Sequence, residues 1–166
     1  WDLYYYFGLG MSTASASFAG RKLGEKRRDL ARLYMKAAQK SGLIVSLVVA
    51  AALLLLRGTI FSAMIADADA AALGAGIIAI VAVLIVPQTQ AQVLAGTLRG
   101  AGDNRFIAQY SRFVSAILRS CIAYVLAFPL GMGLYGIWGT LLIDEVLKML
   151  LTEYRIGKGI WLTKEL

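Results

Sequence analysis

The sequence predicts an all-α integral membrane protein, a bundle of about five transmembrane helices, and three observations support this fold class. Apolar residues make up 59% of the 166-residue chain and charged residues only 16%, which is unusual for a soluble domain. Four long runs contain no charged residue, at 3–20, 41–56, 70–98 and 120–143. Because a helix needs roughly 20 apolar residues to cross the hydrocarbon core, these runs favour helices in lipid.

We expect one membrane domain over residues 1–166, with spans at roughly 3–20, 39–57, 72–98, 107–129 and 134–154. The connection 20–40 carries eight basic residues against two acidic ones, and the connection around Asp103 and the tail 155–166 are also basic. Under the positive-inside rule, these three segments face the cytoplasm. The sequence thus predicts a multi-pass protein of the cell (inner) membrane with a cytoplasmic C-terminus.

The basic connection 20–40 also has an apolar face at helical spacing, formed by Leu30, Leu33, Tyr34, Ala37 and Ala38. We expect a separate amphipathic helix on the membrane surface, with its cations near anionic lipid head groups. Nucleic acid could bind the same charges, but the positive-inside rule explains them without a further partner. Membrane lipids, and not nucleic acid, are therefore the expected partners here.

Polar side chains lie within two of the predicted spans. In the third span, Pro87 predicts a kink, and Gln88 and Gln92 follow it on one helical face. Amides at membrane depth point toward protein or a water-filled cavity, so hydrogen bonds between helices and the wall of a substrate cavity both remain open. In the first span, Ser12 and Ser15 belong to a small-residue run that favours close helix packing and could also line a polar pathway.

Charged side chains in the last two spans form a second candidate site. Arg119 lies near the middle of the fourth span, where an unpaired charge would cost at least about 2.5 kcal/mol. Asp144, Glu145 and Lys148 of the fifth span are its candidate partners, and Asp144 and Lys148 have the favourable i, i+4 spacing. One interpretation is a structural charge network, and the other makes one carboxylate a site for a coupling proton or sodium ion. Because a neighbouring cation lowers the pKa of a carboxylate, pairing is favoured over proton exchange.

The residue types present also argue against catalysis and cofactor binding. The chain has no histidine and a single cysteine, Cys121, so a histidine-based metal site and an intrachain disulfide are excluded within it. A glycine-rich phosphate loop and a nucleophile paired with a histidine base are also missing from the sequence. We therefore expect no enzyme activity and no cofactor other than a coupling proton or sodium ion. Since the sequence starts at Trp1 without methionine, we expect a fragment.

Several stretches together resemble the multidrug and toxic compound extrusion (MATE) family. Residues 16–24 are similar to a helix end and cytoplasmic turn of that family, although Ala19 and Arg21 replace its usual valine and glutamine. The most specific stretch is 87–103, which resembles the family's proline-glutamine helix and its closing leucine-arginine-glycine-alanine-glycine-aspartate turn. Residues 131–161 resemble the family's last helix and its basic, tryptophan-bearing tail.

The turn in the most specific stretch consists of Arg99, Gly100, Gly102 and Asp103. We expect Gly100 and Gly102 to end the helix where positive φ is needed, and Asp103 or Asn104 to cap the next helix. A contact of Asp103 with substrate is the less favoured alternative.

The resemblance implies a twelve-helix exporter of two lobes that exchanges organic cations, drugs and toxic compounds for protons or sodium ions. It places this chain as helices eight to twelve, so that the N-terminal lobe of the same protein would be its partner. Sodium-coupled members of one subgroup carry an acidic residue in the tenth helix, where this chain has only the amides and hydroxyl of residues 88–92. The coupling carboxylate is therefore expected in the other lobe. A lipid-linked saccharide flippase, or a membrane scaffold with a basic lipid-binding helix, remains the alternative.

Overall fold

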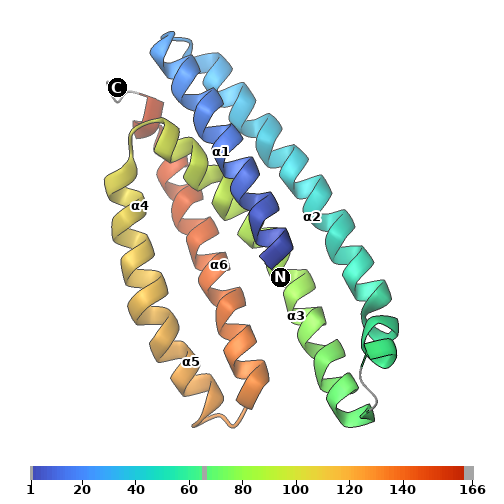
Figure 1. The fold of residues 1–166 in the computed structure, drawn as a ribbon. Helices are drawn as coiled ribbons and strands as arrows, with labels where there is room; N and C mark the ends of the chain where they lie inside the picture. Colours follow the sequence, from blue (N-terminus) through green and yellow to red (C-terminus); the bar gives the residue numbers. More distant parts are fainter. Residues whose placement is uncertain (1, 65–66, 163–166) are drawn as a thin grey trace.

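The computed structural model describes residues 2–64 and 67–162, and these residues are helical with no strand among them. Figure 1 shows the helices running roughly side by side as a bundle. The elements in chain order are α1 (Asp2–Gly24), α2 (Arg28–Met64), α3 (Ala68–Gly100), α4 (Asn104–Ser111), the π-helical segment η1 (Arg112–Leu118), α5 (Arg119–Ala127), α6 (Gly133–Gly157) and the 3-10 helix η2 (Ile160–Leu162).

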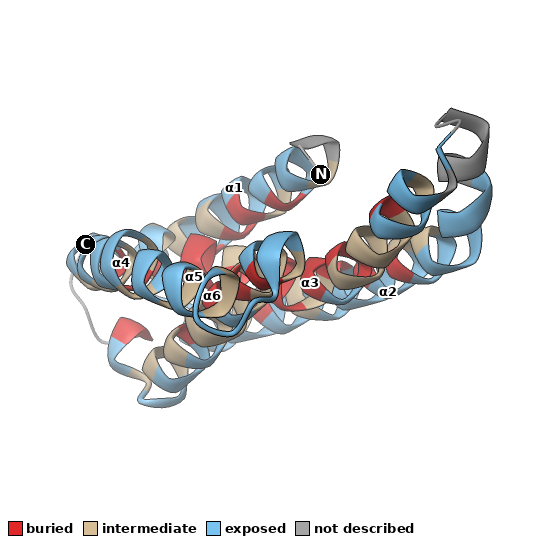
Figure 2. Ribbon diagram, turned by 90° about the horizontal axis from the view of Figure 1, so that it is seen from below, coloured by how far each residue is buried: buried red, intermediate tan, exposed pale blue. Residues whose placement is uncertain are grey.

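Helix α3 is the centre of the bundle. It packs against α1, α2 and α6, and the continuous span formed by α4, η1 and α5 lies beside α6. Figure 2 shows buried residues concentrated along α3, whereas the outer helices expose most of their surface. Leu84, Ile85, Val93, Leu94 and Leu98 of α3 are all almost completely buried. A helix that is apolar on every side is expected at the centre of a membrane bundle.

The outer surface of the bundle is apolar, as lipid contact requires. Large apolar side chains such as Ile44, Val48, Leu55, Phe128 and Leu150 are more than half exposed. Three helical segments are long and apolar enough to cross a membrane: Arg28–Thr59, Asp69–Gly100 and Asn104–Ala127. The all-α membrane fold predicted from the sequence is confirmed.

The second helix differs from its prediction. The structure has one helix from Arg28 to Met64, so the helix expected within residues 20–40 continues into the second span. Leu33 and Tyr34 of the predicted apolar face are exposed. On an adjoining side of the helix, Ala31 and Met35 belong to a buried cluster with Leu98 and Trp161. Residues outside the predicted face therefore hold this segment against the bundle.

The fourth span is continuous but irregular. Residues 112–118 form a π-helix between α4 and α5, although we expected a regular helix over 107–129. Such wide turns are rare and are found often at functional sites. The third span runs as one helix through Pro87.

The basic connections meet at one end of the bundle. Figure 1 shows the α1–α2 turn, the α3–α4 turn and the C-terminal segment at the same end, and the other two connections at the opposite end. This arrangement is what an alternating membrane topology requires. Trp1, residues 65–66 and residues 163–166 of the predicted tail lie outside the described residues.

Helices α1 and α3 approach each other closely along a line of small residues, which we call the α1–α3 seam. A Cβ atom at Gly96 would lie 2.1 Å from the carbonyl oxygen of Ser12, and one at Gly100 would lie 2.1 Å from that of Ala16. At Gly20 of α1, a Cβ atom would lie 2.9 Å from the carbonyl oxygen of Gly100. Small residues spaced by four allow this backbone contact in membranes. The close packing predicted for the first span is therefore present.

The turn after α3 uses its two glycines differently. Gly102 has φ +74°, which favours glycine as predicted. Gly100 is helical and does not have positive φ, so that prediction is wrong for this residue. Glycine is needed at position 100 because of the close contact with α1.

Candidate functional site

Two adjoining cavities open between α1, α3, the α4–η1–α5 span and α6, and together we call them the cleft. The first encloses about 150 Å³ and the second about 440 Å³. Tyr5, Ser111, Glu145 and Lys148 line both. The cleft is therefore one polar space with contributions from every part of the bundle except α2.

The side of α3 that lines the cleft is set by helical spacing. Leu84, Ala91, Gln92, Ala95 and Arg99 all contribute to its wall, and they recur at intervals of three, four and seven residues. The small side chains of Ala91 and Ala95 leave room that larger residues would fill. Opposite them, α1 contributes Tyr5, Leu9 and Ser12 to the first cavity.

The structure divides the four residues predicted to form the substrate cavity into two pairs. Gln92 and Ser12 line the first cavity. Gln88 and Ser15 do not appear in the walls of either cavity. The Ser15 hydroxyl is buried in the α1–α3 seam, where it shares a hydrogen bond of 2.7 Å with the Thr97 hydroxyl.

Two glutamine side chains of α3 are left with unused polar atoms. Gln88 is fully buried, and neither its amide oxygen nor its amide nitrogen has a hydrogen-bond partner in the described part of the chain. The buried oxygen Oε1 of Gln92 is also without a partner there. An unpaired amide in a membrane interior is costly. By contrast, Gln90 donates to the backbone carbonyl of Gln39 at 3.2 Å, so this third amide serves helix packing.

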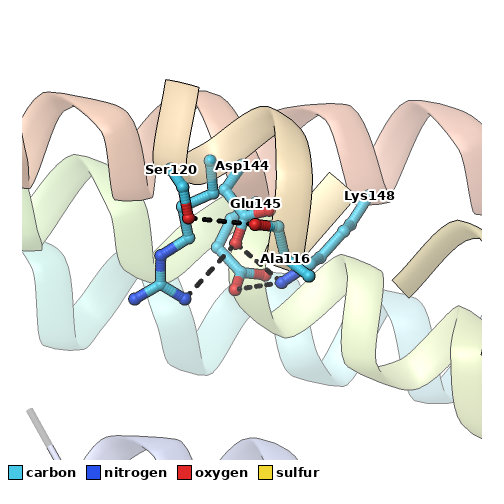
Figure 3. A network of polar contacts seen from close by, with 6 residues as sticks. Ala116, Ser120, Asp144, Glu145 and Lys148 are labelled. Atoms are coloured by element: carbon cyan, nitrogen blue, oxygen red, sulfur yellow. Dashed lines mark hydrogen bonds and ion pairs between the residues drawn. The ribbon is translucent and has the colours of Figure 1, made fainter. Parts of the chain in front are cut away.

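The four charged residues predicted to interact do form one group, which we call the charge cluster. Figure 3 shows Lys148 between the carboxylates of Asp144 and Glu145. Lys148 Nζ lies 2.8 Å from Asp144 Oδ2 and 3.3 Å from Glu145 Oε1. Arg119 is more distant, with its guanidinium 3.9 Å from Asp144 Oδ2. Two acidic and two basic side chains therefore offset one another within the bundle.

Burial differs strongly within the charge cluster. The side chain of Asp144 is 1% exposed and that of Arg119 is 45% exposed. The second carboxylate oxygen of Asp144, Oδ1, is buried without a hydrogen-bond partner in the described residues. Glu145 and Lys148 line both cavities, and Arg119 lines the second. Arg119 is the loosely held, accessible member of the cluster.

Asp103 of the predicted turn motif lies outside the cleft. Asp103 occupies the N-cap position of α4, but its side chain makes no capping hydrogen bond. Asn104 is the first residue of the helix and does not occupy the cap position. The expected cap is therefore wrong. Instead, Arg155 Nε donates to Asp103 Oδ2 at 2.7 Å, and this hydrogen bond raises the pKa of Arg155. The Arg155 guanidinium also lies over the ring of Phe106, 5.1 Å from its centre. These contacts join the α3–α4 turn to the end of α6.

Sequence reasoning missed several polar residues of the cleft. Tyr5, Tyr110, Ser111, Ser115 and Arg99 line it but were not predicted as cavity residues. A usable signal existed in the fourth span, because Ser111, Ser115 and Arg119 recur every four residues in an otherwise apolar stretch. Residues spaced in this way share one side of a helix.

This helical bundle has an apolar exterior and a polar, charge-lined cleft between its helices. That combination is typical of membrane transporters and is not expected of soluble proteins or enzymes. Comparisons with known proteins agree. The family model described as MatE matches residues 1–125. The chain therefore belongs to the MATE family of multi-pass membrane transporters.

Relatives and a solved structure support this assignment. A Schizosaccharomyces pombe protein named "Uncharacterized transporter C4B3.13" is 31% identical over 82% of this chain and 25% of its own length. Protein DETOXIFICATION 30 of Arabidopsis thaliana is 24% identical over 94% of this chain and 31% of its own length. The transporter YisQ of Bacillus subtilis is 29% identical over 95% of this chain and 35% of its own length.

The fold also matches a crystal structure of the eukaryotic MATE transporter AtDTX14. The TM-score is 0.86 at 16% sequence identity, over 95% of this chain and 35% of that chain. This chain thus spans about a quarter to a third of the proteins that it matches.

Proposed function

We propose that this chain forms part of a secondary active antiporter that exports amphipathic or cationic drugs and toxic compounds in exchange for protons or sodium ions. The observation that carries this proposal is the cleft. It combines aromatic and aliphatic walls with a few polar groups, among them Ser12, Gln92 and Glu145. Such a lining suits an amphipathic compound, because most of its surface contacts apolar atoms and its polar group finds a partner.

The rest of the transporter is part of the same proposal. We infer that a second lobe of the same protein, with membrane lipids around both, completes the central cavity, since this chain spans only 25 to 35% of its relatives. The basic connections at one end of the bundle support a cytoplasmic C-terminus in the cell (inner) membrane. No nucleic acid is proposed as a partner.

A transport assay on the intact protein that contains this chain tests the proposal. In everted vesicles, Gln92→Ala should lower the rate of dye export several-fold, because the amide lines the cleft. Gln90→Ala is the matched control: its amide donates to Gln39 on α2, so export per folded transporter should stay within about twofold of wild type. Equal export by Gln92→Ala and wild type would remove the cavity assignment. Imposing a sodium gradient or a pH gradient separately identifies the coupling ion.

One observation favours a lipid-linked saccharide flippase as a second candidate. Three cationic side chains line the cleft: Arg99, Arg119 and Lys148. Several cations would suit the phosphates of such a lipid. Because Lys148 is already paired with two carboxylates, drug export remains the leading proposal. Vesicles that flip a labelled polyprenyl-phosphate saccharide without exporting dye would reverse that preference.

A further inference from the structure

We propose that the charge cluster is a binding site for one monovalent cation, and that Arg119 occupies this site as a tethered competitor when it is empty. The proposal rests on the proposed function, because it concerns the same cleft. It adds a chemical class for the ligand, an organic ammonium group or a sodium ion, and a specific exchange: the arriving cation takes the place of the guanidinium.

Charge balance is the first argument. Asp144 and Glu145 carry two negative charges, and Lys148 and Arg119 carry two positive charges. If Arg119 withdraws, the remaining three side chains have a net charge of −1. An uncompensated charge inside a membrane protein is costly, so one arriving monovalent cation restores the balance. A divalent ion would overcompensate it.

The geometry identifies Arg119, and not Lys148, as the exchangeable partner. Lys148 contacts both carboxylates at 2.8 and 3.3 Å, and its side chain is 16% exposed. Arg119 reaches only one carboxylate, at 3.9 Å, and its side chain is 45% exposed. A distance of 3.9 Å is too long for a hydrogen bond. Arg119 therefore contributes charge with little directional bonding, and replacing it breaks no hydrogen bond to Asp144.

Room for a ligand lies next to the guanidinium. Arg119 and Glu145 line the cavity of about 440 Å³, which can hold a small organic cation. Asp144 lines neither cavity of the cleft, and its side chain is 1% exposed. Glu145 is therefore the carboxylate that an arriving cation meets beside Arg119.

Arg119 lies directly after the π-helical segment. Segment η1 ends at Leu118, and Arg119 is the first residue of α5. Ser111, Ser115 and Arg119 are spaced by four residues, and all three line the second cavity. Wide π-helical turns are found often at functional sites.

Equilibrium binding to the purified intact transporter tests the proposal with two probes, tetraphenylphosphonium for the organic cation and radioactive sodium for the ion. Arg119→Gln removes the competitor and should tighten binding of one probe about tenfold. Glu145→Gln removes a carboxylate and should weaken the same probe about tenfold. Added methylguanidinium should reverse the gain in Arg119→Gln, because it replaces the missing side chain. Whichever probe responds identifies the source of the cation.

Two control variants separate this exchange from general charge effects. Arg119→Lys keeps the competing charge and should bind both probes as wild type does. Arg112→Gln removes a positive charge from the same span, but Arg112 is exposed and lines a different surface hollow. It should therefore leave both affinities within about twofold, as a screened distant charge would.

Unchanged affinity for both probes in Arg119→Gln would overturn the proposal, and so would equal tightening in Arg112→Gln. If Arg119→Gln does not yield folded protein, Glu145→Gln decides, and wild-type binding of both probes by that variant overturns the proposal. Dye export is measured in parallel. A transporter that exports no dye but shows the expected binding pattern would refute the proposed function and leave the cation site standing.

Discussion

The α1–α3 seam and the cleft lie on neighbouring sides of the same helix, yet they handle polar groups in opposite ways. In the seam, Gly96 and Gly100 bring two backbones into contact, and the hydroxyls of Ser15 and Thr97 bond to each other. In the cleft, Ala91 and Ala95 leave space, and Gln92 and Glu145 contribute polar groups to the wall. Small residues thus allow tight helix packing where two backbones meet, and they leave a cavity where the backbones lie apart.

We expect the largest loss of stability from a glycine substitution in the seam. Gly96→Leu would place a Cβ atom 2.1 Å from the Ser12 carbonyl oxygen. Because the obstacle is backbone, α1 and α3 must separate, and we expect a loss of about 3 kcal/mol or more in unfolding free energy. Unfolding in a titration with a denaturing detergent measures it. Gly10→Leu is the control, since nothing lies within 4 Å of a Cβ there; equal losses in both variants would contradict a closed seam.

The contact between Asp103 and Arg155 joins the α3–α4 turn to the end of α6. Asp103→Ala leaves Arg155 without its carboxylate partner, while Arg155 is 24% exposed and can be hydrated. We therefore expect a loss of about 2 kcal/mol, less than for a fully buried pair. Thermal unfolding in detergent would show it. Asp29→Ala, an exposed change at the start of α2, should have a much smaller effect, and a similar loss there would refute the role given to Asp103.

The hydrogen bond in the seam should matter less than the backbone contact. Ser15→Ala removes the bond to Thr97, but the Thr97 hydroxyl keeps its bond to the Val93 carbonyl at 3.1 Å. We expect a loss of about 0.6 kcal/mol, as for other hydrogen bonds between membrane helices. The same detergent titration applies. A loss as large as that of Gly96→Leu would mean that hydroxyls, not glycines, hold the seam together.

We expect the smallest effect from the ion pair at the turn between α1 and α2. Lys22 donates to Glu25 at 2.8 Å, and this hydrogen bond lowers the pKa of Glu25. A lowered carboxyl pKa means that the contact is fully present above the ordinary value and is lost as the pH falls through the lowered one. Carboxyl chemical shifts followed by NMR during an acid titration should show this, and Lys22→Gln should raise the midpoint. An unmoved midpoint would show that the pair has no effect in solution.

The fold could be predicted from the sequence largely because lipid solvation imposes simple rules. The uncharged runs, the small residues of the first span and the alternation of basic connections correspond to α1, α2, α3, the α4–η1–α5 span and α6. The sequence did not show that residues 28–40 continue into α2. Ala31 and Met35, which lie outside the predicted apolar face, pack against Leu98 and Trp161. Nothing in the sequence pattern indicated the π-helix.

The candidate site could be predicted in part. Asp144 and Lys148 are neighbours on one helix, so local spacing was sufficient to pair them. Gln88 and Gln92 share a helical face, but only Gln92 lines the cleft, because the depth of a side chain depends on which helices cover it. Tyr5 and Tyr110 reach the cleft from distant parts of the chain. Such convergence depends on the packing of α1 and α4 and cannot be obtained from periodicity.

Access of a water-soluble thiol reagent tests the contrast between open cleft and closed seam most directly. Cys121 is the single cysteine of this chain and is exposed, so Cys121→Ser, together with replacement of any cysteine elsewhere in the intact protein, gives the background for the test. In that background Ser111→Cys lies in both cavities and Ser15→Cys lies in the seam. A charged, membrane-impermeant methanethiosulfonate should label position 111 at least tenfold faster than position 15, and a bound transport substrate should slow it. Equal labelling at the two positions, or labelling of position 15 alone, would contradict the account.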